Sequence, residues 1–257
     1  MSRCSGILMA LSSLPSNWGI GTMGKSAYEF VDFLRNAGQK YWQLLPLVPT
    51  SCGNSPYSSF STYAGNPNYI DLDMLANGGL LKKDEIKDVD WGGDCAKTDY
   101  DKVSAGREKL LRKAFERGRE RYADETAAFR QDSFWIEDYA LYMAAKTYFG
   151  MKTWMEWDDR ALRMREHDAL CRYRELLKDE IEYHCFVQML FYKQWNALRA
   201  YAHRNGVQFI GDIPIYVALD SADVWSEPHF FMLDGDNMPT LVAGCPPDAF
   251  SDEGQFW

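Results

Sequence analysis

The sequence predicts an α/β fold built around a parallel sheet, and three observations support this. Residues 6–45 show the pattern strand, helix, strand with a short return, which places the two strands side by side and parallel. A third apolar strand is predicted at 207–213, after a long apolar helix at 179–205. Between these segments, residues 72–174 are charged and helix-forming, which indicates an inserted helical subdomain.

The first strand and helix follow from the order of apolar and turn-forming residues. Gly6–Leu11 is apolar and predicts a buried strand, and Ser12–Trp18 has the Pro, Ser and Asn content of a loop. In the helix that follows, Ser26 and Glu29 are spaced as a capping box, and Gly38 supplies the C-terminal stop. The apolar stripe of this helix consists of Ala27, Phe30, Val31 and Leu34.

The second strand leads into a loop of unusual length. Tyr41–Leu45 predicts a second buried strand, which Pro46 ends. Residues 46–68 are rich in Pro, Ser, Gly, Asn and Tyr, and Gly53–Tyr57 forms the tip of this segment. A loop longer than a plain connection is usually functional, so we expect a binding role for it at the end of a strand.

The rest of the chain is predicted as helices, one strand and a hairpin. A helix over 107–121 has Leu110, Leu111, Ala114 and Phe115 on one side. The long helix at 179–205 ends at an Asn-Gly pair and leads into the third strand, which is also predicted to be buried. Phe230–Val242 predicts a hairpin that turns at Asp234–Asn237.

The composition excludes several classes of function. A 46% apolar content is typical of a folded protein, and a net charge of −9 offers no basic surface to a nucleic acid. The six cysteines form no Cys-x-x-Cys pair and the four histidines lack metal-ligand spacing, which predicts reduced thiols and no metal. No stretch approaches the ~20 apolar residues of a membrane helix. We therefore expect a cytoplasmic protein with neither nucleic acid nor membrane as partner.

One glycine-rich segment imitates a nucleotide-binding motif. Gly19–Ser26 satisfies the phosphate-loop pattern, and its three glycines also fit the dinucleotide fingerprint. Both motifs require the glycines to leave a strand directly, so that loop amides and a helix N-terminus converge on phosphate. Here Ser12–Trp18 intervene with a proline. A nucleotide-binding protein is therefore a remote alternative, with Asp212 as its candidate magnesium carboxylate.

Several blocks of sequence resemble one known family in order and spacing. The blocks are Leu11–Ser16 with Gly19–Gly21, Gln43–Leu47 with Pro49–Thr50, Ser55–Tyr57 with Ala64–Pro67, Gly211–Ala218, Asp220–Trp225, and Ala243–Asp248. Together they resemble the amylomaltases, which are bacterial 4-alpha-glucanotransferases also called disproportionating enzymes. The resemblance extends from Gly6 to Trp257, nearly the whole chain.

The resemblance implies a (β/α)8 barrel of the alpha-amylase type, with a helical insertion after the second strand and another insertion after the third. Such a barrel needs eight strand–helix units, and the sequence places three, so we expect only the N-terminal part of the barrel. Residues 1–71 would form the first βα units and 72–178 the helical inserted subdomain. Residues 179–214 would form a barrel helix and the third strand, and 215–257 a second insertion with a truncated active-site loop.

The activity that the resemblance implies is transfer of alpha-1,4-glucan segments to a glucose or maltooligosaccharide acceptor, without a cofactor. The family is retaining, so one carboxylate acts as nucleophile and another as acid/base in a double displacement. In the family these lie in an Arg-x-Asp-His block and a Gly-Glu-Asp block, and neither string occurs here. We expect both carboxylates beyond Trp257 and assign no catalytic residue.

The resemblance does imply sugar-binding residues in this chain. Tyr57, beside Ser55, matches the family tyrosine that lies flat against the glucose ring at the cleavage point. Asp212 matches an aspartate that hydrogen-bonds within the site at the end of the third strand. The loop that folds over the donor glucan is matched by Asp248, Phe250, Gln255 and Trp257. The family usually has a second aromatic residue beside Phe250, where this chain has Ala249.

Two other functions stay open. One is a catalytically inactive, aromatic-lined fragment that binds glucans, and the other is the nucleotide-binding protein. An Arg-x-Asp-His block encoded soon after Trp257 would favour the enzyme, whereas a stop codon would favour the inactive fragment. A melting temperature raised by ATP with magnesium would favour nucleotide binding, because a ligand of the folded state stabilises it.

Overall fold

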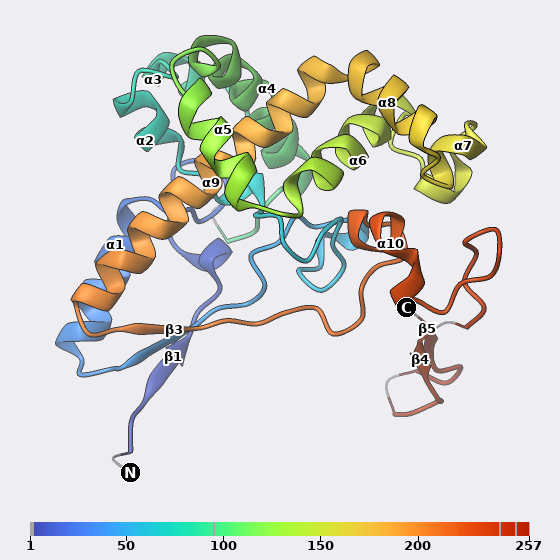
Figure 1. Cartoon of the computed structure of the whole chain (residues 1–257). Coiled ribbons are helices and arrows are strands. Elements are labelled where there is room, and N and C mark those ends of the chain that lie inside the picture. Colours follow the sequence, from blue (N-terminus) through green and yellow to red (C-terminus); the bar gives the residue numbers. More distant parts are fainter. Residues whose placement is uncertain (1–2, 95, 242, 250, 257) are drawn as a thin grey trace. The chain divides into compact units, whose positions relative to one another are not determined.

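The structure is a computed structural model that describes residues 3–94, 96–241, 243–249 and 251–256. The chain divides into two compact units, each formed from three segments, and Figure 1 shows the elements of both. Unit 1 consists of Met1–Pro49, Ala64–Phe134 and Cys185–Ile213, and unit 2 of Thr50–Tyr63, Trp135–His184 and Pro214–Trp257.

Unit 1 contains the predicted parallel sheet. Its strands are β1 (Gly6–Leu8), β2 (Tyr41–Gln43) and β3 (Gln208–Ile210), in the order β1-β2-β3. Both pairs are parallel, and Ile7, Trp42 and Phe209 lie in one row across the sheet. The helix α1 (Lys25–Asn36) connects β1 to β2, as the sequence predicts.

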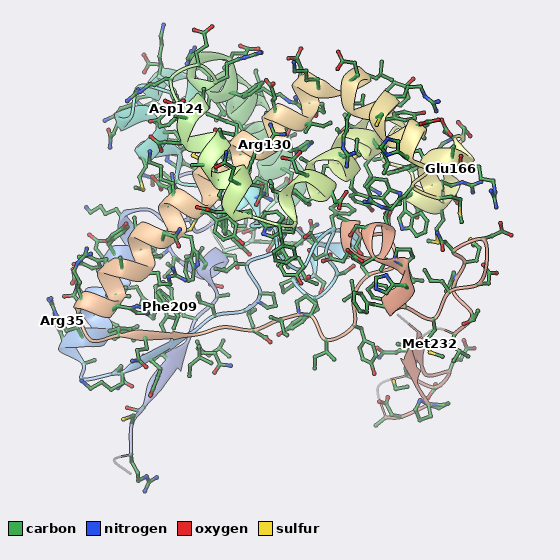
Figure 2. All side chains as sticks on the ribbon, viewed as in Figure 1. Arg35, Asp124, Arg130, Glu166, Phe209 and Met232 are labelled. Carbon is green, nitrogen blue, oxygen red and sulfur yellow. The ribbon has the colours of Figure 1, made fainter. Side chains whose placement is uncertain are left out.

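One face of this sheet packs against helices. The Trp42 ring is fully buried and contacts Phe30 of α1, with ring centroids 4.8 Å apart. Phe209, labelled in Figure 2, contacts both Trp42 and Trp195, at centroid distances of 5.2 and 4.9 Å. Trp195 belongs to α9 (Lys178–Arg204), so α1 and α9 cover the face that carries the central row.

The prediction that the first and third strands are buried is wrong. Leu8 is 55% exposed and Ile210 is 43% exposed. Both lie in the row next to the one that contains Trp42, and successive side chains of a strand point to opposite faces. Their row therefore points away from the helices, and the apolar pattern of these strands predicts more burial than unit 1 provides.

The helix α1 confirms the predicted stripe but not the predicted cap. Ala27, Val31 and Leu34 are fully buried, and Gly38 has a φ of +71°, which suits glycine as a helix stop. The capping box of Ser26 and Glu29 is absent, because the N-cap residue is Gly24 and the helix already includes Ser26. The Ser26 hydroxyl instead donates to the carbonyl of Pro15, at 2.7 Å.

The helices of unit 1 confirm the other long helical predictions. They are α2 (Leu72–Asn77), α3 (Lys83–Lys87), α4 (Tyr100–Gly118) and α5 (Ala123–Asp132). The short 3-10 turns η1 (Leu11–Ser13) and η3 (Pro67–Tyr69) also lie here. The stripe predicted on α4 is buried, and α9 ends before Gly206, whose φ is +73°. α9 begins within the segments of unit 2 and ends within those of unit 1.

Unit 2 is built from helices around a cluster of aromatic rings. Its helices are α6 (Ile136–Tyr148), α7 (Arg160–Arg163), α8 (His167–Leu176) and α10 (Ala222–Ser226), with the 3-10 turns η2 (Cys52–Asn54), η4 (Trp154–Glu156) and η5 (Pro228–Phe230). Trp157 and Trp225 are buried, with ring centroids 5.7 Å apart, and Tyr142 contacts both rings. These rings form the core of unit 2.

The hairpin predicted near residue 234 is present in unit 2. An antiparallel bridge joins Leu233 to Pro239, and the Asp234 carboxylate accepts hydrogen bonds from the amides of Asp236 and Met238, both at 2.9 Å. Asn237 has a φ of +58°, which a turn asparagine tolerates. The predicted end of this hairpin, Val242, lies outside the described residues.

Candidate functional site

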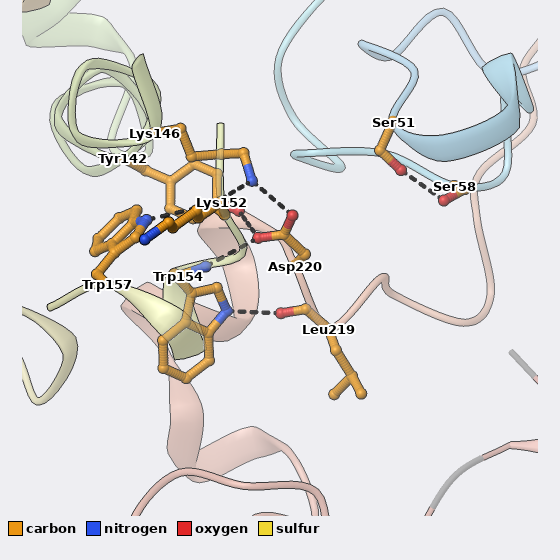
Figure 3. Close-up of polar contacts among 9 residues, drawn as sticks. All are labelled: Ser51, Ser58, Tyr142, Lys146, Lys152, Trp154, Trp157, Leu219 and Asp220. Carbon is orange, nitrogen blue, oxygen red and sulfur yellow. Dashed lines mark hydrogen bonds and ion pairs between the residues drawn. The ribbon is translucent and has the colours of Figure 1, made fainter. Parts of the chain in front are cut away.

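Residues 50–63, here called the Tyr57 loop, form a closed loop in unit 2. At its neck an antiparallel bridge joins Thr50 to Ser59, and the Ser51 amide donates to the Ser58 carbonyl at 2.8 Å. The hydroxyls of Ser51 and Ser58 share a further hydrogen bond at 2.6 Å, drawn in Figure 3. The serines that suggest a loop in the sequence therefore close it.

The tip of this loop presents an aromatic ring. The turn before it uses two residues with positive φ, Gly53 at +74° and Asn54 at +55°. The Ser55 hydroxyl accepts a hydrogen bond from the Tyr57 amide at 3.3 Å, and the Ser55 carbonyl accepts one from the Ser58 amide at 3.1 Å. Tyr57 is 48% exposed. The structure thus brings Ser55 and Tyr57 together, with Ser55 ordering the backbone that carries the ring.

The base of the Tyr57 loop is fixed to the segment after β3. The Phe60 carbonyl accepts a hydrogen bond from the Ala222 amide at 2.8 Å. The Asp223 carboxylate accepts from both the amide and the hydroxyl of Thr62, at 2.9 and 2.8 Å. Burial raises the pKa of the Asp223 carboxyl, so its two hydrogen bonds offset part of the cost of burying the charge.

An ion pair between a buried lysine and a partly exposed aspartate lies beside this base, and the sequence gives no sign of it. Lys146 of α6 pairs with Asp220 at 2.6 Å, although the lysine side chain is only 1% exposed (Figure 3). Asp220 also accepts a hydrogen bond from the Tyr142 hydroxyl at 2.7 Å. Burial, and then the Asp220 charge, raises the pKa of Tyr142, which keeps this hydroxyl a donor.

Asp212 lies in unit 1, two residues after β3. It is half-buried, and its carboxylate accepts a hydrogen bond from the Ile213 amide at 2.9 Å. The position is at the carboxyl end of a parallel strand, where binding and catalytic residues of α/β proteins gather. The strand predicted over 207–213 includes Asp212, whereas β3 ends at Ile210, so the structure places the aspartate beyond the strand, as the family resemblance implies.

The described residues of the predicted donor loop form a second hairpin in unit 2. β4 (Gly244–Cys245) pairs antiparallel with β5 (Gln255–Phe256), with Cys245 opposite Gln255. The Asp248 carboxylate accepts a hydrogen bond from the Ser251 amide at 3.0 Å, and both Asp248 and Gln255 are exposed. The structure therefore places these two residues on one hairpin. Phe250 and Trp257 lie outside the described residues.

The glycine-rich segment of unit 1 is filled by the protein itself. The Gly21 amide donates to the Ser12 carbonyl at 3.0 Å, and a Cβ at Gly24 would overlap the Asp71 carboxylate. That carboxylate accepts hydrogen bonds from the Thr22 hydroxyl at 2.7 Å and the Met74 amide at 2.8 Å. A carboxylate occupies the position where the motif would need a phosphate, and it would repel one. This geometry argues against the nucleotide-binding alternative.

Within the described part of the chain, no three His, Cys, Asp or Glu side chains are grouped as metal ligands would be. Among the helices described, none is both long and apolar enough to cross a bilayer.

Comparison with known proteins gives consistent matches over this chain. A family profile described as 4-alpha-glucanotransferase, glycoside hydrolase family 77, matches residues 9–257. The 4-alpha-glucanotransferase of Streptococcus pneumoniae serotype 4 is 49% identical over 257 residues, which cover 99% of this chain and 51% of that protein. The 4-alpha-glucanotransferase of Thermus thermophilus is 44% identical over 262 residues, covering 100% of this chain and 51% of that protein.

Solved structures give the same result. An amylomaltase from Streptococcus agalactiae in complex with acarbose superposes with a TM-score of 0.96 at 46% identity, covering 100% of this chain and 52% of that one. An amylomaltase from Corynebacterium glutamicum has the same fold, with a TM-score of 0.71 at 18% identity over 99% of this chain and 35% of that one. The chain thus spans about half the length of the curated relatives it matches.

Proposed function

Because this chain belongs to glycoside hydrolase family 77, the 4-alpha-glucanotransferases, we propose that it supplies the glucan-binding part of such an enzyme. The enzyme would transfer segments of alpha-1,4-glucans to a glucose or maltooligosaccharide acceptor. The expected fold, an alpha-amylase-type barrel of which this chain forms a part, is confirmed by the match to the Streptococcus agalactiae structure. That Streptococcus agalactiae structure contains acarbose, which supports a sugar site in this chain.

The observation that carries the proposal is the presentation of Tyr57. Its ring stands at the tip of a loop with a hydrogen-bonded neck, and 48% of its surface is exposed. The C–H face of a pyranose packs well on an aromatic face, and a loop whose backbone is already ordered loses little entropy when a sugar covers the ring. We therefore assign Tyr57 to stacking on the glucose ring at the cleavage point.

The other predicted residues receive supporting roles in this proposal. Asp212 would hydrogen-bond within the site from the end of β3. Asp248, Phe250, Gln255 and Trp257 would fold over the donor glucan, with Ser55 ordering the Tyr57 loop. Ala249, where the family usually has an aromatic residue, would weaken the grip of this loop on long glucans.

The chemistry proposed is a retaining double displacement. One carboxylate attacks the anomeric carbon while a second, roughly 5 Å away, protonates the departing sugar and then activates the incoming hydroxyl. We place neither carboxylate among residues 1–257, because the sequence blocks that hold them in the family do not occur here. The role of this chain is to bind and orient the glucan, and the site needs no metal or organic cofactor.

We also propose a domain organisation and a cellular location for this chain. Residues 1–71 and 179–214 would supply barrel units, 72–178 the helical insertion, and 215–257 the second insertion with the donor loop. The six cysteines form no Cys-x-x-Cys pair, and the proposed location is cytoplasmic.

The test uses the complete product of the gene that contains this chain, here called the natural-length protein. Incubated with maltotriose, it should release glucose and form longer maltooligosaccharides while the total number of reducing ends stays constant. A rise in reducing ends would indicate hydrolysis instead. Binding of maltoheptaose without any transfer would favour the inactive glucan-binding fragment over the enzyme.

A further inference from the structure

Lys146 is the feature of unit 2 that the proposed function leaves unexplained. Its ammonium group lies 2.6 Å from an Asp220 carboxylate oxygen, 3.1 Å from the Lys152 carbonyl and 4.9 Å from the centre of the Phe60 ring. Burying an ammonium group is costly unless it is paired, and a hydrophobic replacement of an ion pair is often as stable. The pair is therefore weak evidence for a purely stabilising role, and Lys146 is a candidate for another role.

The partner of Lys146 is held from several sides. Asp220 Oδ1 accepts hydrogen bonds from the Tyr142 hydroxyl at 2.7 Å and the Trp154 amide at 3.2 Å. The neighbouring Leu219 carbonyl accepts one from the Trp154 indole at 2.7 Å (Figure 3). These contacts fix residues 219–220 against α6 and η4. The segment after β3 therefore has one defined position within unit 2.

That segment carries the Tyr57 loop. Two residues beyond Asp220, the Ala222 amide donates to the Phe60 carbonyl at 2.8 Å, and the Asp223 carboxylate binds Thr62 twice. The Phe60 ring itself lies under the Lys146 ammonium group. Lys146 thus reaches the base of the loop by two routes, through Asp220 and directly through Phe60. Phe60 is three residues from Tyr57.

We propose that Lys146 is a positioning residue, which sets the orientation of the Tyr57 ring toward the glucan through Asp220 and Phe60. This inference rests on the proposed function, because it assigns the ring to sugar stacking. Without the ammonium group, Asp220 would lack its cation and Phe60 its cation–π partner, and the base of the loop would shift. Small displacements of a positioning group cost large factors in rate.

The test is a double-mutant cycle in the natural-length protein, with maltotriose as substrate. Lys146→Met should lower kcat/KM for transfer by about tenfold, and Tyr57→Ala by more. If Lys146 acts through Tyr57, Lys146→Met should cause less than about a twofold further loss in the Tyr57→Ala background. Equal losses in both backgrounds, or no loss in either, would overturn the inference.

Arg107 provides the matched control for loss of a buried cation. Its guanidinium is 1% exposed, donates to the Ile70 carbonyl at 2.6 Å and lies 5.7 Å from the Trp91 ring centre, all within unit 1. Arg107→Met should lower the melting temperature but leave kcat/KM within about twofold, measured well below melting. A loss equal to that of Lys146→Met would mean that Lys146 acts through stability alone.

Tyr142→Phe covers the case in which Lys146→Met does not fold. It removes one donor to Asp220 and keeps the buried ring, so we expect a loss of about threefold that also disappears in the Tyr57→Ala background. If Tyr142→Phe caused the same threefold loss of kcat/KM in the Tyr57→Ala background, the inference would again be overturned. If the unsubstituted protein transfers no glucose units, the proposed function fails and the inference fails with it. If transfer is normal and only the coupling is missing, the inference alone fails.

Discussion

Replacing Tyr57 with alanine should damage glucan transfer far more than folding. The ring is 48% exposed at the tip of a closed loop, so about half of it remains to be covered by a sugar. An aromatic side chain buries about 150–250 Å², and half of this leaves roughly 100 Å² for the ligand. At ~25 cal/mol per Å², covering that area contributes about 2.5 kcal/mol.

The assay follows from that magnitude. In the natural-length protein, Tyr57→Ala should lower kcat/KM on maltotriose by about tenfold to hundredfold. The buried half of the ring contributes about 1–2 kcal/mol to folding, since truncating a fully buried aromatic side chain costs about 3–5 kcal/mol. The melting temperature should therefore fall by only a few degrees.

Tyr57→Phe is the control for this prediction. It keeps the stacking face and removes the hydroxyl, so it should retain most of the activity. A wild-type kcat/KM for Tyr57→Ala, or a loss of activity matched by a collapsed melting temperature, would contradict the stacking role of Tyr57.

Three further predictions concern unit 1 and the chain as a whole. Gly24→Ala should lower the free energy of unfolding by about 1–3 kcal/mol, because its Cβ would overlap the Asp71 carboxylate; urea unfolding measures this, and unchanged stability would contradict the packing described. Glu85, paired with Arg117 through two contacts of 2.7 Å, has a pKa well below its ordinary value because of the Arg117 hydrogen bonds. Its stabilising effect should be present at neutral pH and lost as the pH falls below the ordinary glutamate pKa, so the stability difference from Glu85→Gln should shrink on acidification; a constant difference would refute the assignment. Residues 1–257 expressed alone should give no sharp cooperative melt, because Leu8 and Ile210 on the outer strands are exposed; a sharp melt of a monomer in calorimetry would contradict this.

Local patterns predicted much of unit 1. The spacing of apolar residues located α1, α4 and α9, and the order strand, helix, strand gave the parallel pairing of β1 with β2. These features depend on residues close in sequence. The same is true of the Asn-rich and Gly-rich turns, whose residues adopt the positive φ angles that such turns require.

Features that depend on distant residues were not predicted. Lys146 and Asp220 are 74 positions apart, and nothing beside either residue in the sequence indicates that they form an ion pair. The predicted capping box of Ser26 is absent because the helix begins one residue earlier, after Gly24, and the Ser26 hydroxyl donates to a loop carbonyl 11 residues earlier. The burial of the outer strands was overestimated because the apolar pattern cannot say which face of a sheet is covered within unit 1.

In the candidate site, too, local sequence predicts some features, whereas others depend on distant residues. The composition of residues 46–68 predicts the loop position of Tyr57, whereas the strand predicted over 207–213 is too long and includes Asp212, which lies after the end of β3. Their roles came only from the family resemblance. The base of the Tyr57 loop is held by hydrogen bonds to Ala222 and Asp223. These residues are distant in sequence, so the loop sequence alone cannot predict the contacts.

We propose that this chain binds the glucan for a transfer reaction and that it does not itself contain the catalytic carboxylates. The most direct measurement is the product pattern from maltotriose, determined in parallel for the natural-length protein and for residues 1–257 alone. We predict glucose and longer maltooligosaccharides at constant reducing ends from the natural-length protein, and no product above a heat-killed control from residues 1–257. Glucose released by residues 1–257 alone, or no transfer by the natural-length protein, would contradict the claim.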